Sequence, residues 1–462
     1  MAYVAVVDIG KTNAKLAVVD SDKEQEADVR TSPNNVVLSD PYPHFDVSNL
    51  WEFLLRSLKE LSGLYNISSI SITTHGASVV LLDAHGELAT PVLDYEFDGP
   101  DELHDSYSEI RPEFTQTGSP RLPGGLNVGA QLYWLFERDK ALATRVNAVL
   151  MYPQYWAYRF CGVKANEVTS LGCHTDLWCP GESDFSRLVD ALNIRALMAP
   201  VRQAAARLGS ILPEIAAATS LSPDTQVYCG IHDSNASLYA HINRLTLPFA
   251  VVSSGTWVVC MAPGSKAPDL DESRDTLLNV SALGQSVPSS RFMGGREYEY
   301  LIDRYSAEQT SQIHESIIDK NAFILPSVET SSGPFQNRRY EWTVDPVSLS
   351  PKERYSVISL YLALMTEVCL ELCHAAGPTV LEGPFTQNKI YCAMLSAATD
   401  RELLGTDGSS TGTSIGAALL TSAGTSTSVY YKSLADKNLA GNGSNSRLRS
   451  YREKWRDKLE TI

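Results

Sequence analysis

Two apolar runs separated by a short polar turn open the sequence. Residues 3–7 and 15–19 are rich in valine and alanine, and the turn between them carries aspartate, glycine, lysine, threonine and asparagine. This pattern predicts a β-hairpin. The letters Gly10-Lys11-Thr12 also end a P-loop motif, but that motif requires a glycine where the chain has Ala5, and it continues into a helix. The turn is therefore not predicted to be a P-loop.

Alternating strand and helix patterns fill the rest of the first half. A helix is expected over residues 47–64, begun by Asp46 or Ser48. A strand that runs directly into a helix is expected before Gly162, where this helix should end. Further strands are expected over residues 68–73, 79–83 and 226–229. This alternation predicts an α/β fold.

The pattern restarts near residue 245. Residues 249–264 again read as strand, tight turn and strand, and their Ser-Ser-Gly-Thr turn parallels the Asp-x-Gly-x-Thr of the first hairpin. A long helix over 355–376 is apolar on nearly all sides and should be buried, whereas the charged segment 446–460 is expected to be an exposed helix. The repeat predicts an internal duplication, with an N-terminal domain over 1–245 and a C-terminal domain over 246–462.

Composition narrows the classes of partner. The 462 residues are 44% hydrophobic and 20% charged, and no apolar run approaches the roughly 18 residues of a membrane span. A net charge of −16 argues against a nucleic-acid partner, although ATP needs only a local site and a divalent cation. The eight cysteines form no C-x-x-C pair, and no secretory signal opens the chain. Free buried thiols in the cytoplasm are expected, with a homodimer as the default assembly.

The two hairpin turns have two interpretations. Each turn alone is more typical of an ordinary hairpin, where Gly, Asn, Asp and Thr are common. Turns of this kind also form concave anion sites from backbone N–H groups. Their recurrence half a chain apart favours a nucleotide held between the two domains.

Six groups of segments carry a family resemblance. In chain order they are "VVDIGKTNAKLAVVD", "ITTHGASVVLLDAHGELATPVLDY", "YPQYWAYRFCG" with "NEVTSLGCHTDLW", "GIHDSNAS", "SSGTW", and "TVLEGPFTQNKIYCAMLSAAT" with "GTSIGAALL". Together, over almost the whole length, they resemble the FGGY carbohydrate kinases, and fuculokinase- and rhamnulokinase-like members most closely. The resemblance implies an α/β fold of two actin-like (ribonuclease H-like) domains with a cleft between them, and phosphorylation of a sugar by ATP.

Asp233 is the residue expected to act on the sugar. It follows a strand and Gly230, and it opens a helix, so it could simply be an N-cap. The resemblance implies that Asp233 is the general base that deprotonates a hydroxyl. Asp8, with Asp233, is expected to bind Mg²⁺; the alternative for Asp8 is an ordinary turn aspartate.

The resemblance also implies two groups of ATP contacts. Lys11, at the tip of the first turn, is expected to be solvated, although it could reach the terminal phosphate. The residues expected to bind phosphates are Gly10, Thr12, Asn13, Lys15, Gly255 and Thr256, and those expected to bind adenosine are Gly383, Pro384, Phe385 and Asn388.

Sugar contacts are expected from His75, Gly76, Glu96, His174 and Asp233. The segment "LDYEFDG" lacks the arginine of the Trp-x-Asp-x-Arg pattern that many members carry. A ketose such as L-fuculose, L-rhamnulose or a pentulose is the expected substrate. The alternatives are a catalytically inactive sugar- or nucleotide-binding regulator on the same fold, and an actin-like filament protein.

Overall fold

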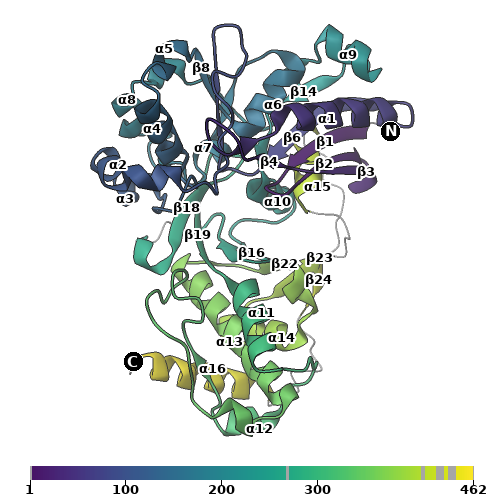
Figure 1. The fold of residues 1–462 in the computed structure, drawn as a ribbon. Helices are drawn as coiled ribbons and strands as arrows, with labels where there is room; N and C mark the ends of the chain where they lie inside the picture. Colours follow the sequence, from purple (N-terminus) through teal and green to yellow (C-terminus); the bar gives the residue numbers. More distant parts are fainter. Residues whose placement is uncertain (1–2, 267–269, 407–411, 423–430, 435–443, 461–462) are drawn as a thin grey trace. The chain divides into compact units, whose positions relative to one another are not determined.

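The computed structural model describes residues 3–266, 270–406, 412–422, 431–434 and 444–460 (Figure 1). The chain divides into two compact units, each with its own sheet. The first unit contains residues 1–245 with 278–286 and 408–428, and the second contains 246–277, 287–407 and 429–462. Neither unit is therefore one continuous stretch of chain.

The sheet of the first unit is built around the N-terminal hairpin. Its strand order is β13-β14-β6-β1-β2-β3, and β15 also pairs with β6. The pairs β1–β6, β6–β14 and β6–β15 are parallel, and the others are antiparallel. The strands are β1 (Tyr3–Ile9), β2 (Asn13–Asp20), β3 (Gln25–Pro33), β6 (Ile67–Thr74), β13 (Arg207–Ser210), β14 (Gln226–Tyr228) and β15 (Ile231–His232). The predicted hairpin is confirmed.

Both faces of this sheet are covered, which explains why β1 is apolar at nearly every position. Ala5, Val7 and Ile9 of β1 join one hydrophobic core, whereas Val4 and Val6 join another on the opposite face. The first core is shared with α1 (Val47–Ser62), α6 (Tyr152–Cys161) and α9 (Pro213–Thr219), and the second with α10 (Asp233–Ile242) and α15 (Gly412–Leu419). As expected, Asp46 caps α1 and Gly162 ends α6.

A further layer of the first unit surrounds the β7–β8 pair, which has a third core of its own. Its elements are β7 (Val79–Leu82), β8 (Ala148–Met151), α2 (His104–Ile110), α4 (Val128–Arg138), α5 (Leu142–Arg145) and α8 (Arg187–Ala191). The remaining short elements of this unit are β4 (Val36–Val37), β5 (His44–Phe45), α3 (Phe114–Thr117), β9 (Asn166–Glu167), α7 (Val168–Leu171), β10 (Trp178–Cys179), β11 (Asp184–Phe185) and β12 (Val201–Arg202).

The sheet of the second unit repeats the first. Three antiparallel strands, β19-β17-β16, are followed by β22 and β23 in parallel, and then by β24. β18 (Thr276–Val280) lies beside β19. The strands are β16 (Ala250–Ser254), β17 (Val258–Met261), β19 (Ser286–Phe292), β22 (Thr379–Glu382), β23 (Leu403–Thr406) and β24 (Tyr431–Ser433). The two sheets thus share one strand order, as an internal duplication predicts.

One buried helix organises the core of the second unit. α13 (Pro351–Leu372) is buried over most of its length, as predicted, and begins four residues earlier than expected because Ser350 and Glu353 form a capping box. Among the described residues it is the one helix long and apolar enough to cross a membrane, but 89% of its most apolar window is buried. The other elements are α11 (Gly294–Arg304), α12 (Glu315–Asp319), β20 (Ile324–Leu325), β21 (Glu341–Trp342), α14 (Lys389–Thr399) and α16 (Ser444–Glu460).

The prediction that the C-terminal helix is exposed is wrong. Helix α16 forms, but Leu448, Tyr451, Trp455 and Leu459 are buried along one side. Arg452 and Arg456 on its flank both bind the buried carboxylate of Glu367 in α13. Four apolar residues at helical spacing were enough to bury a segment whose other residues are mostly charged.

All eight cysteines are buried and free, as the absence of a paired spacing predicted.

Candidate active site

The carboxyl ends of three neighbouring parallel strands gather polar residues at one edge of the first sheet. Asp8 of β1 is level with Thr73 of β6, and His232 of β15 is level with Thr74. His75 directly follows β6, and its backbone N–H donates to the carbonyl of Ile9 at 3.0 Å. Asp233 follows β15. The edge of an α/β sheet where parallel strands end is where ligands bind in this class of fold.

Asp233 is the first residue of α10 but not its N-cap, which is His232. Its carboxylate accepts hydrogen bonds from the backbone N–H and the hydroxyl of Ser234. The side chain remains 32% exposed. The alternative that Asp233 is there as an N-cap therefore does not match the helix start.

His232 lies directly against Asp233, and Cys173 lies against His232. The Nε2 atom of His232 is 3.1 Å from Oδ1 of Asp233 and 3.4 Å from Sγ of Cys173. Burial alone would raise the pKa of Asp233, but the charge and hydrogen bond of His232 outweigh it and hold that pKa below its usual value. Burial also opposes ionisation of Cys173, yet His174 and His232 lower the pKa of that thiol to about 5. The pKa of His232 is raised by its two anionic neighbours despite burial.

Gly76 makes this packing possible. A Cβ atom at this position would lie 2.7 Å from Sγ of Cys173 and 2.8 Å from Cδ2 of His232. Gly76 therefore lets the two side chains approach the end of β6. Cys173 and His232 were missed by sequence reasoning, although each adjoins a predicted residue, His174 and Asp233.

Asp8 shares a lysine with a second carboxylate. Lys15 Nζ is 3.4 Å from Oδ2 of Asp8 and 3.1 Å from Oε1 of Glu26. Burial raises the pKa of Asp8 to about 6, Lys15 opposes that shift, and the charge of Asp233 adds to it. Asp8 lies in β1 and Asp233 directly follows β15, so both carboxylates are at the same edge of the sheet.

The β1–β2 turn is fixed by its own backbone and by Asn34. The N–H of Gly10 donates to the carbonyl of Asn13 at 2.9 Å, so it is used within the turn. Asn34 donates from its backbone N–H to the carbonyl of Thr12 at 2.9 Å and from its side chain to that of Gly10 at 2.8 Å. Thr12 and Asn13 are exposed. Their side chains are what the turn presents to a ligand.

Lys11 was expected to be solvated, and this is wrong. Its side chain is only 18% exposed and forms ion pairs with Asp94 and, at 3.3 Å, with Oε2 of Glu96. The two carboxylates come from the loop after β7, more than 80 residues away, which local sequence patterns do not reveal. Glu96, a predicted sugar contact, is thus beside Lys11 and keeps a side chain that is 64% exposed.

His75 is enclosed by aromatic rings. Its ring centroid lies 5.0 Å from those of Tyr95 and Tyr152 and 5.4 Å from that of Phe45. Neither ring nitrogen has a hydrogen-bond partner among the described residues, and burial lowers the pKa of His75 to about 3. His174, the other predicted histidine, has Nδ1 2.9 Å from the carbonyl of Leu126. His75 is therefore a neutral imidazole with free hydrogen-bonding capacity.

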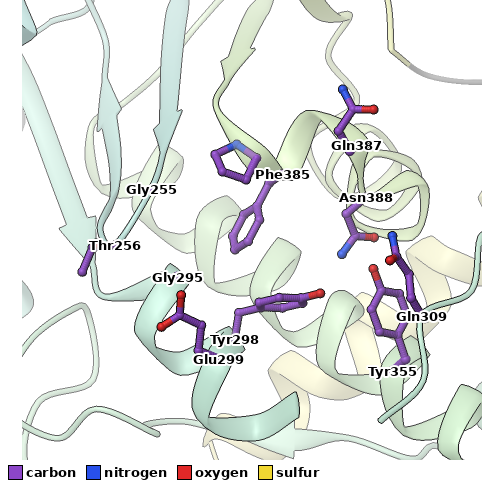
Figure 2. Close-up of a pocket in the computed structure, with 11 residues that line it drawn as sticks. Gly255, Thr256, Gly295, Tyr298, Glu299, Gln309, Tyr355, Phe385, Gln387 and Asn388 are labelled. Atoms are coloured by element: carbon purple, nitrogen blue, oxygen red, sulfur yellow. The ribbon is translucent and has the colours of Figure 1, made fainter. Parts of the chain in front are cut away.

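The second unit contains a cavity of about 310 Å³ (Figure 2). This volume lies in the range typical of small-molecule sites, about 300–1,000 Å³. Its predicted lining residues are Gly255, Thr256, Pro384, Phe385 and Asn388; the residues that sequence reasoning missed are Gly295, Tyr298, Glu299, Gln309, Tyr355 and Gln387. The predicted residue Gly383 is not part of the lining.

Aromatic rings form one wall of this cavity. The ring of Tyr298 lies 5.8 Å from that of Phe385 and 6.4 Å from that of Tyr355, both edge to face. Figure 2 shows the amide of Gln309 beside Asn388 and Tyr355, and the carboxylate of Glu299 near Gly295. Flat apolar faces with a few polar groups at the margin are suited to a nucleoside base and its ribose.

Three glycines allow close backbone packing at or next to the cavity. A Cβ at Gly295 would lie 2.0 Å from the carbonyl oxygen of Gly255, so α11 begins directly against the β16–β17 turn. Gly383 has φ +81° and passes so close to the carbonyl of Ser254 that a Cβ would lie 1.8 Å from it. Gly383 thus positions Pro384 and Phe385 rather than lining the cavity itself. The backbone N–H of Gly255 donates to the carbonyl of Trp257 at 2.9 Å, so it is used within its own turn.

The donor groups at Asp8 and Asp233 are compatible with Mg²⁺. Among the described residues, no group of three or more His, Cys, Asp or Glu side chains is arranged to hold a metal ion. Mg²⁺ is commonly held by one or two carboxylates together with water and substrate phosphates. Asp8 in β1 and Asp233 at the start of α10 are carboxylates of this kind.

Comparison with known proteins identifies the family. Residues 3–240 match the N-terminal domain of the FGGY family of carbohydrate kinases, and residues 246–428 match the carbohydrate kinase FGGY C-terminal domain. The crystal structure of a carbohydrate kinase from Novosphingobium aromaticivorans is 32% identical with a TM-score of 0.90, covering 99% of this chain and 98% of that one.

Two curated relatives are more distant. Rhamnulokinase of Bacillus subtilis is 22% identical over 264 residues, and L-fuculokinase of Salmonella typhi is 23% identical over 266 residues. Each match covers 56% of this chain, and the chain spans about half the length of these relatives, 53% and 56% respectively. The expected fold class, two α/β units of the actin-like, ribonuclease H-like kind, is confirmed. The chain belongs to the FGGY family of carbohydrate kinases.

Proposed function

We propose that the protein phosphorylates a sugar with ATP, and that the sugar is a ketose such as L-fuculose, L-rhamnulose or a pentulose. Membership of the family supports the reaction type, and the relatives named rhamnulokinase and L-fuculokinase support the substrate class. The observation that carries the proposal is the Asp233 carboxylate, partly exposed at the strand edge and kept ionised by His232.

Asp233 is assigned the role of general base. An ionised carboxylate on the first turn of a helix, fixed by Ser234 and His232, can accept the proton of a substrate hydroxyl. The hydroxyl oxygen then attacks the terminal phosphorus of ATP, the bond from that phosphorus to the bridging oxygen breaks, and ADP leaves. Positioning and charge neutralisation provide most of the catalysis in such transfers.

The sugar is assigned to the group around His75. A neutral, unpartnered imidazole offers one donor and one acceptor to sugar hydroxyls. Glu96 and His174 are assigned as further contacts, and Gly76 provides space for the packing beneath them.

The nucleoside is assigned to the cavity of the second unit, with Phe385 and Tyr298 against the base. Thr12, Asn13, Lys15 and the turn at Gly255 and Thr256 are assigned to the phosphates. Asp8 and Asp233 would hold Mg²⁺, which would neutralise phosphate charge when bound.

An assay of ADP release with L-fuculose, L-rhamnulose, L-ribulose and D-xylulose tests the proposal. We expect turnover with at least one of them, and Asp233→Asn should lower kcat by about 10²–10⁴-fold while ATP still binds. Asp224→Asn, the same change at an exposed carboxylate of the same unit, should leave kcat unchanged. Nucleotide binding without turnover on any sugar would instead favour a catalytically inactive regulatory protein, and normal activity in Asp233→Asn would reject the base assignment.

A cytoplasmic location and a homodimer are proposed with the activity. The eight free, buried cysteines fit a reducing compartment. The assembly follows only from the frequency of homodimers.

A further inference from the structure

The amine of Lys11 is held by two carboxylates of one loop. It donates to Oδ1 of Asp94 and lies 3.3 Å from Oε2 of Glu96. Asp94 is 10% exposed and Lys11 18%, so their pairing is largely removed from water. Such a pair depends on both partners, because the loss of one leaves an unpaired charge in a poorly hydrated place.

Asp94 shapes this loop as well as binding Lys11. Its carboxylate also accepts a hydrogen bond from the backbone N–H of Glu96 at 3.2 Å, and its own N–H donates to the carbonyl of Pro43 at 3.0 Å. The conformation of residues 94–96 is therefore coupled to the position of the Lys11 amine.

The same amine lies over two aromatic rings. Lys11 Nζ is 5.1 Å from the ring centroid of Phe45 and 5.0 Å from that of Tyr95. Both distances are within the range of cation–π attraction, about 6 Å. Lys11 thus fixes Tyr95 in two ways, through the ring itself and through the carboxylates on either side of it in sequence.

Phe45 and Tyr95 in turn enclose His75, which is 7% exposed and, within the described part of the chain, has no partner for either ring nitrogen. An unsatisfied buried polar group is costly unless a ligand completes its hydrogen bonds. The placement of Tyr95 therefore determines how a ligand reaches His75.

We propose that Lys11 is a positioning residue that determines sugar affinity, by holding the Asp94–Glu96 loop and Tyr95 against His75, and that it does not bind the phosphates of ATP. This inference rests on the proposed function, because it takes His75 and Glu96 as part of the sugar site. In this role Lys11 binds carboxylates of the protein, whereas the lysine of a P-loop binds the phosphates of the nucleotide.

The test compares Lys11→Met, Lys11→Arg and Lys23→Met with the ketose that the wild-type protein turns over fastest. Methionine keeps most of the aliphatic length without the charge. Lys23, in the turn between β2 and β3, pairs with Asp20 and is 63% exposed, so it is the matched control. For Lys11→Met we expect KM for the sugar to rise at least about tenfold, with kcat and KM for ATP within about threefold of wild type.

Lys11→Arg should restore most of the sugar affinity, and Lys23→Met should resemble wild type. Asp94→Asn approaches the same contact from the other side and should raise KM for the sugar in the same way, so a folding defect in one variant does not decide the result. If Lys11→Met keeps the sugar KM of wild type but has a higher KM for ATP or a lower kcat, the proposal is overturned. It is also overturned if the sugar KM, the KM for ATP and kcat are all unchanged.

Calorimetric titration of each ketose without nucleotide separates this inference from the proposed function. A wild-type protein that binds a ketose without phosphorylating it would refute the kinase activity, while weaker binding to Lys11→Met would still support the role of Lys11. Equal binding by the two proteins would refute that role.

Discussion

At the scale of single residues, the buried carboxyl of Glu297 predicts how the second unit responds to pH. Glu297 is 1% exposed and accepts hydrogen bonds from the hydroxyl of Tyr361 at 2.9 Å and the N–H of Glu329 at 3.0 Å. Burial raises its pKa from 4.5 to about 7. Between these values the folded protein holds a proton that the unfolded chain has released, so the free energy of unfolding falls as pH rises through this window.

Thermal unfolding from pH 4 to pH 8 measures this effect. The full cost of ionising Glu297 in the folded state is on the order of 3 kcal/mol. Glu297→Gln should flatten the decline in Tm over this pH range, whereas Glu299→Gln, an exposed neighbour on the same helix, should keep it. An equal slope in Glu297→Gln would mean that other groups cause the decline.

The position of a residue at the end of a strand could be predicted from the sequence. The contacts of a residue whose partner lies far away along the chain could not. Asp8, His75 and Asp233 each stand at or just beyond the end of a strand. Lys11 and Asp94 are 83 residues apart, and Cys173 and His232 are 59 apart. These contacts arise from tertiary packing, so the pattern around Lys11 indicated only an exposed turn.

At the scale of elements, α16 shows the limit of reading a helix by its charges. The hairpins, α1 and α13 were predicted because apolar runs, caps and turn residues are local signals. In α16 the charged residues outnumber the apolar ones, yet Trp455 is fully buried and donates from Nε1 to the carbonyl of Ile324 at 2.8 Å. We therefore expect Trp455→Ala to lower the free energy of unfolding by about 3–5 kcal/mol.

Denaturant unfolding of Trp455→Ala beside Lys454→Ala measures this contribution. Lys454 is the preceding residue and is exposed, so its truncation should change stability by no more than about 0.5 kcal/mol. If both substitutions changed the free energy of unfolding by the same small amount, the helix would behave as an exposed charged helix instead.

At the scale of the whole molecule, the first unit is completed by a helix from the far end of the chain. Helix α15 packs on α10 and beneath β1, and the hydroxyl of Ser71 in β6 donates to the carbonyl of Ala417 at 2.6 Å. The duplication could be predicted from two similar hairpins. The return of residues 412–419 to the first unit could not, because nothing local distinguishes them from other small-residue helices.

Gly416 tests whether α15 is part of the first unit. A Cβ at Gly416 would lie 1.7 Å from the carbonyl oxygen of Ala236 in α10, and backbone cannot yield as a flexible side chain does. Gly416→Ala should therefore destabilise the protein by about 1–3 kcal/mol. Gly181→Ala, where a Cβ meets nothing within 4 Å, is the control. Hydrogen exchange followed by mass spectrometry should show faster exchange in α10 and β1 of Gly416→Ala and unchanged exchange in α13. If exchange became faster in α13 alone, or did not become faster in α10, the assignment of α15 to the first unit would be contradicted.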